Sequence, residues 1–154
     1  MEDTARPSPF APFRIRIFAL LWVATLVSNV GTWMHDVGAG WLMTTLDPKP
    51  LTVALVQAAT TLPVFLFALP AGAIADIFDR RVLLLGVNAA MMLLTAALAF
   101  FVAAERVTPE MLIGFTFALG TGAAFLAPAW QAIVPALVPR ETLQAAITLN
   151  SLGI

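Results

Sequence analysis

The sequence lacks several of the residues on which protein chemistry usually depends. Its 154 residues include no cysteine, no tyrosine and a single histidine. Without cysteine, disulfide bonds and thiolate metal sites are excluded, and so few histidines and tyrosines leave little for acid–base catalysis. Charged residues make up only 11% of the chain, with a net charge of −1, whereas soluble domains contain about 25%. A chain without a basic face cannot neutralise phosphates, so no nucleic acid partner is expected.

Sequence motifs of enzymes are missing as well. The chain contains no HExxH, no phosphate-binding P-loop, no Gly-x-Ser-x-Gly and no pair of carboxylates deep in an apolar run. We therefore expect that the protein is not an enzyme and has no catalytic residues, no metal site and no cofactor. A nucleotide-driven pump would need the missing P-loop, so an ion gradient is the expected energy source for any transport.

The sequence does contain long uncharged stretches. It is 60% hydrophobic, with a mean hydropathy of +0.93, and about 20 apolar residues suffice to cross the hydrocarbon layer. The expected spans are residues 17–44, 51–75, 82–104 and 110–138, and residues 142–154 begin a fifth run that is too short to cross. This pattern predicts an all-α membrane protein, a helical bundle in the lipid bilayer with about four complete transmembrane helices plus the start of a fifth. Since the chain stops inside a helix, we expect a fragment or truncated product of a longer protein.

Lysine and arginine predict the side of the membrane on which each connection lies, because cytoplasmic connections are enriched in them. With residues 1–16 as a cytoplasmic N-terminal segment, only Lys49 and Arg106 fall outside. The protein would then be a multi-pass protein of the plasma or inner membrane of the cell. The basic residues on the cytoplasmic side would be Arg6, Arg14, Arg16, Arg80, Arg81 and Arg140.

The connection between the second and third expected spans reads GAIADIFDRR, residues 72–81, and is called the charged turn here. Arg80 and Arg81 suit the anionic cytoplasmic leaflet, where each contributes about 1 kcal/mol. Topology alone does not explain Asp76, because a carboxylate at the end of a span needs a hydrogen-bond donor. Gly72, one turn earlier, leaves room for a neighbouring helix. We therefore interpret the charged turn as a docking element for another helix end.

The charged turn resembles the loop signature of the major facilitator superfamily, and the residues that carry this resemblance are Gly72, Asp76, Arg80 and Arg81. The resemblance implies a conformational latch, in which these residues dock on the C-terminal half of the same protein and stabilise one side of an alternating-access cycle. That half is missing from this chain and would be a partner of it. Ile77 and Asp79 depart from the signature, where arginine and glycine are common. A second interpretation is that Asp79 pairs locally with Arg80 or Arg81.

A later stretch makes the resemblance narrower. Residues 128–143, PAWQAIVPALVPRETL, followed by Asn150-Ser151, are similar to the transmembrane secretion effectors, the bacterial subgroup that includes the enterobactin exporter. Residues 20–42 resemble the first helix of the same subgroup. The resemblance implies a major-facilitator-type helical bundle, in which residues 17–154 are a partial N-terminal transmembrane half.

The function implied by this resemblance is secondary active transport. The protein would export small molecules by alternating access, driven by an ion (proton) gradient, with its small-molecule substrate bound near the bilayer midplane. Proton-coupled drug exporters of the superfamily often carry an arginine shortly before a Gly-x-Gly of the fourth helix. Gly120-Thr121-Gly122 has no such arginine before it, which argues against that relay. A non-transporting multi-pass membrane scaffold and a truncated inactive remnant are the alternative interpretations.

Polar residues of the first expected span form one stripe, because Thr25, Asn29, Thr32 and Asp36 recur at helical spacing. In lipid such groups need protein or water around them. Asn29 and Thr32 are candidate cavity-lining residues, with hydrogen bonding to a neighbouring helix as an equal alternative. His35 and Asp36 are candidate proton-coupling residues, for which a solvated helix end near the outer interface is the more economical alternative.

Other residues of the spans predict how the helices pack. Scattered polar residues are expected to hydrogen-bond neighbouring helices, and they are Thr60, Thr61, Asn88, Thr95, Thr116 and Thr121. Close helix packing is expected at a patch of small residues, Gly120, Gly122, Ala123 and Ala124. Interrupted helices are expected at Pro63, Pro70 and Pro128.

Overall fold

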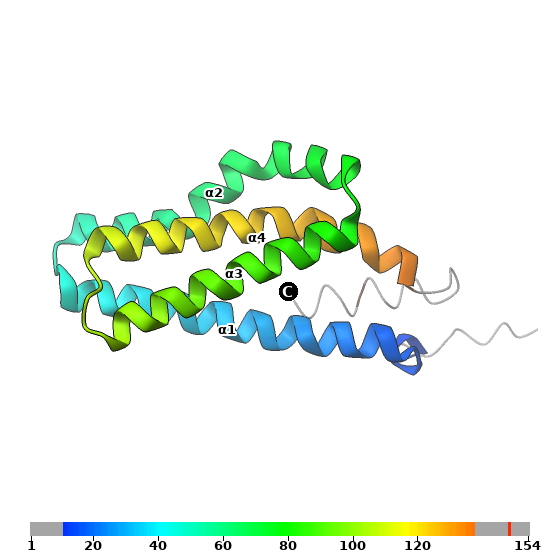
Figure 1. The fold of residues 1–154 in the computed structure, drawn as a ribbon, viewed down its shortest axis with the longest axis horizontal. Coiled ribbons are helices and arrows are strands. Elements are labelled where there is room, and N and C mark those ends of the chain that lie inside the picture. The colour runs from blue at the N-terminus through cyan, green and yellow to red at the C-terminus, as the bar shows by residue number, and fades with distance from the viewer. Residues whose placement is uncertain (1–10, 138–147, 149–154) are drawn as a thin grey trace, which may run out of the picture. The chain divides into compact units, whose positions relative to one another are not determined.

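The structure, a computed structural model, describes residues 11–137 and residue 148. A short 3-10 helix, η1 (Ala11–Arg14), precedes four α-helices (Figure 1). These are α1 (Arg16–Leu46), α2 (Pro50–Ile77), α3 (Arg80–Ala103) and α4 (Pro109–Leu137). No strand occurs among the described residues. The all-α class predicted from the sequence is thus confirmed, whereas the expected fifth run, 142–154, lies outside the described residues except for residue 148.

All four α-helices are long and apolar enough to cross a membrane. The shortest, α3, has 24 residues, which gives about 36 Å of helix for a hydrocarbon layer of about 30 Å. Their apolar side chains are mostly not covered by the protein itself. Leu69 is 88% exposed and Phe65 is 85% exposed, for example. Because lipid accepts such surface and water does not, the chain is a multi-pass membrane protein.

Local sequence signals explain where the helices begin. Pro50 occupies the first turn of α2, where its missing N–H is not needed. Asp79 is the N-cap of α3, and its Oδ1 accepts hydrogen bonds from the backbone N–H groups of Arg81 (2.8 Å) and Val82 (3.3 Å). At α4 the Thr108 hydroxyl oxygen accepts from the Met111 N–H at 3.3 Å. Each cap satisfies donors that the helix itself cannot satisfy.

The connection between α1 and α2 is organised around Asp47. The Thr52 hydroxyl donates to Oδ2 of Asp47 at 2.9 Å, and Nζ of Lys49 lies 3.4 Å from the same oxygen. The Thr52 hydroxyl first, and Lys49 second, hold the pKa of the Asp47 carboxyl below its ordinary value, because both favour the charged form. This carboxylate therefore ties the turn to the start of α2.

The described chain divides into two compact units, residues 34–130 and residues 1–33 with 131–154. The core of the 34–130 unit draws on all four helices, with Ala39 and Met43 from α1, Val56 from α2, Leu98 from α3 and Leu112 from α4. Met43, Val56 and Leu112 are almost completely buried. This cluster holds together the ends of the helices that carry the Asp47 turn.

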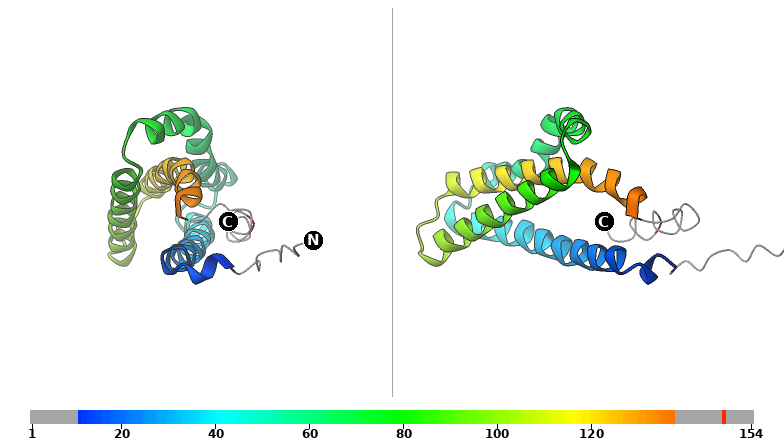
Figure 2. Two further views of the ribbon diagram at one scale, coloured as in Figure 1. Left: turned by 90° about the vertical axis from the view of Figure 1, so that its right-hand side faces the viewer. Right: turned by 45° about the vertical axis from the view of Figure 1, so that its right-hand side comes forward.

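Within the same unit, α2 changes direction partway along its length (Figure 1), and the right-hand view of Figure 2 shows its second half close to end-on. Pro63 and Pro70 lie inside the helix. Each lacks an N–H and clashes with the carbonyl four residues earlier, which is the usual cause of a kink. Pro63 is fully buried, whereas Pro70 is exposed.

The small residues of α4 allow close packing, as the sequence predicted. A Cβ on Gly120 would lie 3.0 Å from the Thr60 carbonyl oxygen and 3.1 Å from both the Ala59 carbonyl oxygen and Cγ of Pro63. A Cβ on Gly122 would lie 2.6 Å from Cγ of Met91 on α3. Gly120 thus meets the backbone of α2, and Gly122 meets a flexible side chain of α3.

In the unit of residues 1–33 and 131–154, the chain folds back on α1 before that helix begins. Phe13 of η1 contacts Phe18 (ring centroids 5.8 Å apart) and Trp22 (5.0 Å) in edge-to-face geometry. Pro12 and Phe18 are buried. These aromatic contacts fix η1 against the first turns of α1.

Candidate functional site

Most polar side chains in the helices find their hydrogen-bond partners within the same helix. The hydroxyl groups of Thr95 and Thr121, for example, donate to the carbonyl oxygens four residues earlier, both at 2.9 Å. The same arrangement, with partners three or four residues earlier, holds for Thr25, Thr32, Thr60, Thr61 and Asn88. The expectation of bonds to neighbouring helices is therefore wrong for Thr60, Thr61, Asn88, Thr95 and Thr121, because a helical hydroxyl or amide reaches its own backbone more readily.

Thr116 is different. Its side chain is 1% exposed, and its hydroxyl oxygen lies 3.5 Å from Nε2 of His35 on α1. The hydroxyl can donate to an unprotonated Nε2 or accept from a protonated one, so the contact is compatible with either tautomer of the ring. This polar contact links α1 to α4. Both helices are apolar, and a polar side chain inside such a helix is costly unless it has a partner.

His35 and Asp36 lie well inside α1. The helix continues from His35 to Leu46, about three further turns, so neither residue is at a helix end. Both are half-buried. Because adjacent helical residues point about 100° apart, the contact with Thr116 belongs to His35 alone.

The His35–Thr116 contact lies next to close packing between helices of the 34–130 unit. Gly120 follows Thr116 by one helical turn and meets α2, as described above. On α1, Gly40 packs against Gln57 of α2, whose Nε2 would lie 3.2 Å from a Cβ at that position. Three helices therefore approach one another around a pair of polar side chains, and we call His35 and Thr116 the polar pair.

The sequence predicted that Thr116 bonds a neighbouring helix, and the contact with His35 on α1 agrees, but it did not single Thr116 out from the other scattered polar residues. A signal was nevertheless present, because Thr116 follows Leu112 by four residues and precedes Leu119 by three, and all three are buried. A hydroxyl at the phase of a buried stripe predicts a partner on another helix.

Asn29 and Thr32, the candidate cavity-lining residues, lie on the preceding turns of α1. Asn29 is half-buried and Thr32 is exposed. The Thr32 hydroxyl donates to the Ser28 carbonyl oxygen at 3.1 Å. A role in a cavity stays a prediction for both.

The charged turn separates its acidic residues into two environments. Asp79 interacts locally with Arg81, but through the backbone N–H of the α3 cap described above. Asp76, on the last turns of α2, is exposed and accepts no hydrogen bond from the part of the chain that the structure describes. Nothing lies within 4 Å of a Cβ placed on Gly72. Asp76 and Gly72 thus form an open surface, and their role as a latch stays a prediction.

A metal centre finds no support in this part of the protein. Between residues 11 and 137, and at residue 148, no three His, Cys, Asp or Glu side chains come together in a group that could hold a metal ion. The chemistry available at the polar pair is hydrogen bonding and proton binding.

Comparison with known proteins places the chain in a family. Residues 7–154 match the transmembrane secretion effector family. An uncharacterized MFS-type transporter of Mycobacterium tuberculosis, and another of Mycobacterium bovis, are each 33% identical over 132 residues, which cover 84% of this chain and 29% of the relative. The staphyloferrin A transporter of Staphylococcus aureus is 27% identical over 123 residues, 79% of this chain and 31% of its own. No solved structure matches.

The fold and these matches define a multi-pass membrane protein of the major facilitator superfamily. The chain belongs to the transmembrane secretion effector family, as its resemblance in residues 72–81 and 128–143 indicated. It spans less than a third of the length of the curated relatives that it matches.

Proposed function

We propose that the chain is part of the N-terminal half of a secondary transporter that exports small molecules by alternating access, driven by a proton gradient. Family membership and the transporter names of its relatives support transport. The polar pair is the observation that carries the proposal, since an ionisable side chain such as His35 inside a membrane span is a candidate for an ion or substrate path. The substrate site and the other half of the carrier would come from the rest of the full-length protein.

In this proposal His35 is the proton-binding group. A histidine changes charge near physiological pH, and a protonated imidazole still has a partner because the Thr116 hydroxyl can accept a hydrogen bond as well as donate one. Asp36, its half-buried neighbour, supplies a negative charge that offsets the proton. Asn29 and Thr32 would line the substrate path one to two turns away on α1.

The charged turn would face the cytoplasm of a cell whose plasma or inner membrane holds the protein. Its open surface at Gly72 and Asp76 has the chemistry of a docking site: an exposed carboxylate beside a position without a side chain. We propose that this surface docks on the C-terminal half and acts as the latch. In the full-length protein, Asp76→Asn would then reduce transport, whereas Asp79→Asn would not, because asparagine also caps helices.

Whether Asn29 and Thr32 line a cavity that water can enter can be tested without knowing the substrate. Asn29→Cys and Thr32→Cys are introduced singly into the full-length protein in intact cells and exposed to a membrane-impermeant thiol reagent. Val27→Cys is the control, because Val27 is an exposed apolar residue on the other side of α1. Labelling of Asn29→Cys and Thr32→Cys with no labelling of Val27→Cys is expected. No labelling of either polar position from either side of the membrane would contradict the cavity and favour a non-transporting scaffold.

The coupling of transport to the proton gradient is tested in everted membrane vesicles. Radiolabelled staphyloferrin A is the first probe, since one relative is named for it. Wild-type protein is expected to accumulate the probe when the vesicle interior is acidified. His35→Gln is expected to abolish accumulation while probe–probe exchange continues. Gradient-driven accumulation by His35→Gln at the wild-type rate would contradict the role of His35.

A further inference from the structure

We propose that α2 has a hinge at Pro63 and that α2 moves against Gly120 of α4 when the hinge bends. Residues 64–77, called the hinged segment, would tilt as a unit relative to residues 50–62. The proposal concerns the motion of one helix and stands whether or not the protein moves a proton or exports its substrate.

The backbone of α2 is weakened where it bends. Pro63 has no N–H to donate to the Ala59 carbonyl oxygen, and Pro70 has none for that of Leu66. Two rungs of the hydrogen-bond ladder are therefore missing within two turns of helix. The change of direction in Figures 1 and 2 lies in this part of α2, so the bend coincides with the weakened backbone.

Gly120 makes the bend possible inside the protein. The carbonyl oxygen of Ala59, freed by Pro63, lies 3.1 Å from the position of a Cβ on Gly120, and the Pro63 ring is equally close. A side chain at position 120 would press against this carbonyl oxygen and against the Pro63 ring. Gly120 thus lets the bent part of α2 approach α4 without a side chain that would interlock with it.

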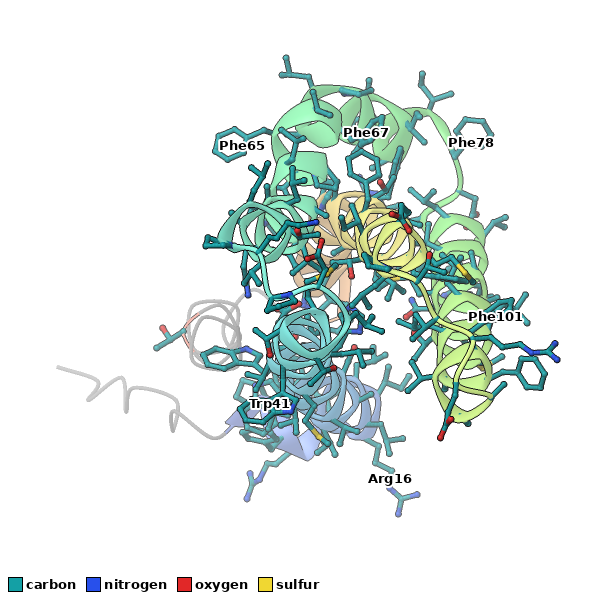
Figure 3. The ribbon with its side chains drawn as sticks, turned by 90° about the vertical axis from the view of Figure 1, so that its left-hand side faces the viewer. Arg16, Trp41, Phe65, Phe67, Phe78 and Phe101 are labelled. Carbon is teal, nitrogen blue, oxygen red and sulfur yellow. The ribbon has the colours of Figure 1, made fainter. Side chains whose placement is uncertain are left out.

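The first half of α2 contributes to the hydrophobic core and the hinged segment does not. Val56 belongs to the core cluster and Val53 packs against that cluster. In the hinged segment the buried residues are Ala71 and Ala75, which have only a methyl group each. Figure 3 shows Phe65 directed away from the neighbouring helices and Phe67 directed toward α4, where its ring centroid is 6.1 Å from that of Phe125. Small side chains and one ring contact resist tilting far less than interlocked large side chains.

The hinged segment ends within the charged turn. Asp76 lies on its last turns, and α3 starts three residues after Ile77. A tilt about Pro63 would therefore change the position of Asp76 relative to the core that holds residues 50–62.

The experiment measures distances between spin labels in the full-length protein, cleared of any cysteine outside this cysteine-free chain and reconstituted in lipid nanodiscs. Leu69→Cys reports the hinged segment and Leu55→Cys the first half of α2, each paired with Phe100→Cys on α3; all three side chains are exposed. The Leu69–Phe100 distance distribution is expected to be at least twice as wide as that of Leu55–Phe100. Equal widths would overturn the proposal.

Matched variants locate the hinge. Pro63→Ala is expected to narrow the Leu69–Phe100 distribution to the width of the Leu55–Phe100 pair, and Pro70→Ala is expected to leave it wide. Gly120→Ala is expected to shift the mean distance, and Gly114→Ala is not, because nothing lies within 4 Å of a Cβ at Gly114. The hinge proposal would be overturned if Pro63→Ala left the width of the Leu69–Phe100 distribution unchanged. It would also be overturned if Pro70→Ala narrowed that distribution as much as Pro63→Ala does, or if Gly120→Ala left the mean distance unchanged.

Discussion

The hydroxyl oxygen of Thr116 and Nε2 of His35 lie 3.5 Å apart and form a polar contact between α4 and α1. Hydrogen bonds between membrane helices contribute about 0.6 kcal/mol on average and up to about 1.7 kcal/mol. Thr116→Val, which keeps the shape and removes the hydroxyl, is therefore expected to lower the free energy of unfolding in mixed detergent micelles by about 1 kcal/mol. Thr95→Val is the matched control, because the Thr95 hydroxyl donates to the Met91 carbonyl oxygen of its own helix.

A double-mutant cycle separates the contact from other effects of the substitution. If Thr116→Val lowers the free energy of unfolding by the same amount in a His35→Gln background as in the wild type, the two residues lie close together but do not interact.

The second prediction concerns the contact between α4 and α2. Gly120→Ala is expected to destabilise the protein by about 1–3 kcal/mol, because the added methyl meets two carbonyl oxygens and a proline ring that cannot rotate away. Gly114→Ala, on the same helix in open space, is expected to be neutral or stabilising by up to about 1 kcal/mol. Equal unfolding free energies for the two variants would show that α4 does not pack on α2 at Gly120.

The third prediction concerns the acidic residues of the charged turn. Asp79→Ala removes the cap of α3 and is expected to lower the free energy of unfolding by about 1 kcal/mol. Asp79→Ser, in contrast, should retain most of the free energy of unfolding that Asp79→Ala loses. Asp76→Ala is expected to leave stability unchanged, because Asp76 is exposed. Loss of stability in Asp76→Ala comparable to that in Asp79→Ala would contradict this division of roles.

The fourth prediction concerns pH. The pKa of Asp47 in the folded protein is lowered, mainly by the Thr52 hydroxyl. The unfolded chain therefore takes up a proton at higher pH than the folded one, so the stabilisation is complete above the ordinary aspartate pKa and is lost as the pH falls through the lowered value. NMR titration of the Asp47 carboxyl in micelles should give a pKa below that of a model peptide. Thr52→Val should raise it, and an unaltered pKa in that variant would assign the shift to another cause.

Much of the fold could be predicted because the membrane imposes simple rules. Uncharged runs long enough to cross a bilayer predicted long apolar helices, and four such helices are present among the described residues. Gly120 and Gly122 indicated tight packing because small residues permit close approach in lipid. These are properties that a single helix reveals by itself.

The partners of individual side chains were less predictable, because they depend on how helices are rotated against one another. Thr95, Thr116 and Thr121 look alike in the sequence, yet among the described residues only Thr116 of these three has its hydrogen-bond partner on another helix. The capping role of Asp79 was missed for a different reason. The adjacent arginines offer Asp79 an alternative side-chain partner, although an aspartate immediately before a helix is a standard N-cap.

The central claim is that these helices cross a lipid bilayer, so that the two ends of α2 lie on opposite sides of it. Pro48→Cys, before α2, and Phe78→Cys, after it, are both at exposed positions and can be treated separately with a membrane-impermeant maleimide. The prediction is that Pro48→Cys is labelled in intact cells, whereas Phe78→Cys is labelled only after the membrane has been permeabilised. Labelling of both positions in intact cells, or of neither until permeabilisation, would place both ends of α2 on one side and contradict the account.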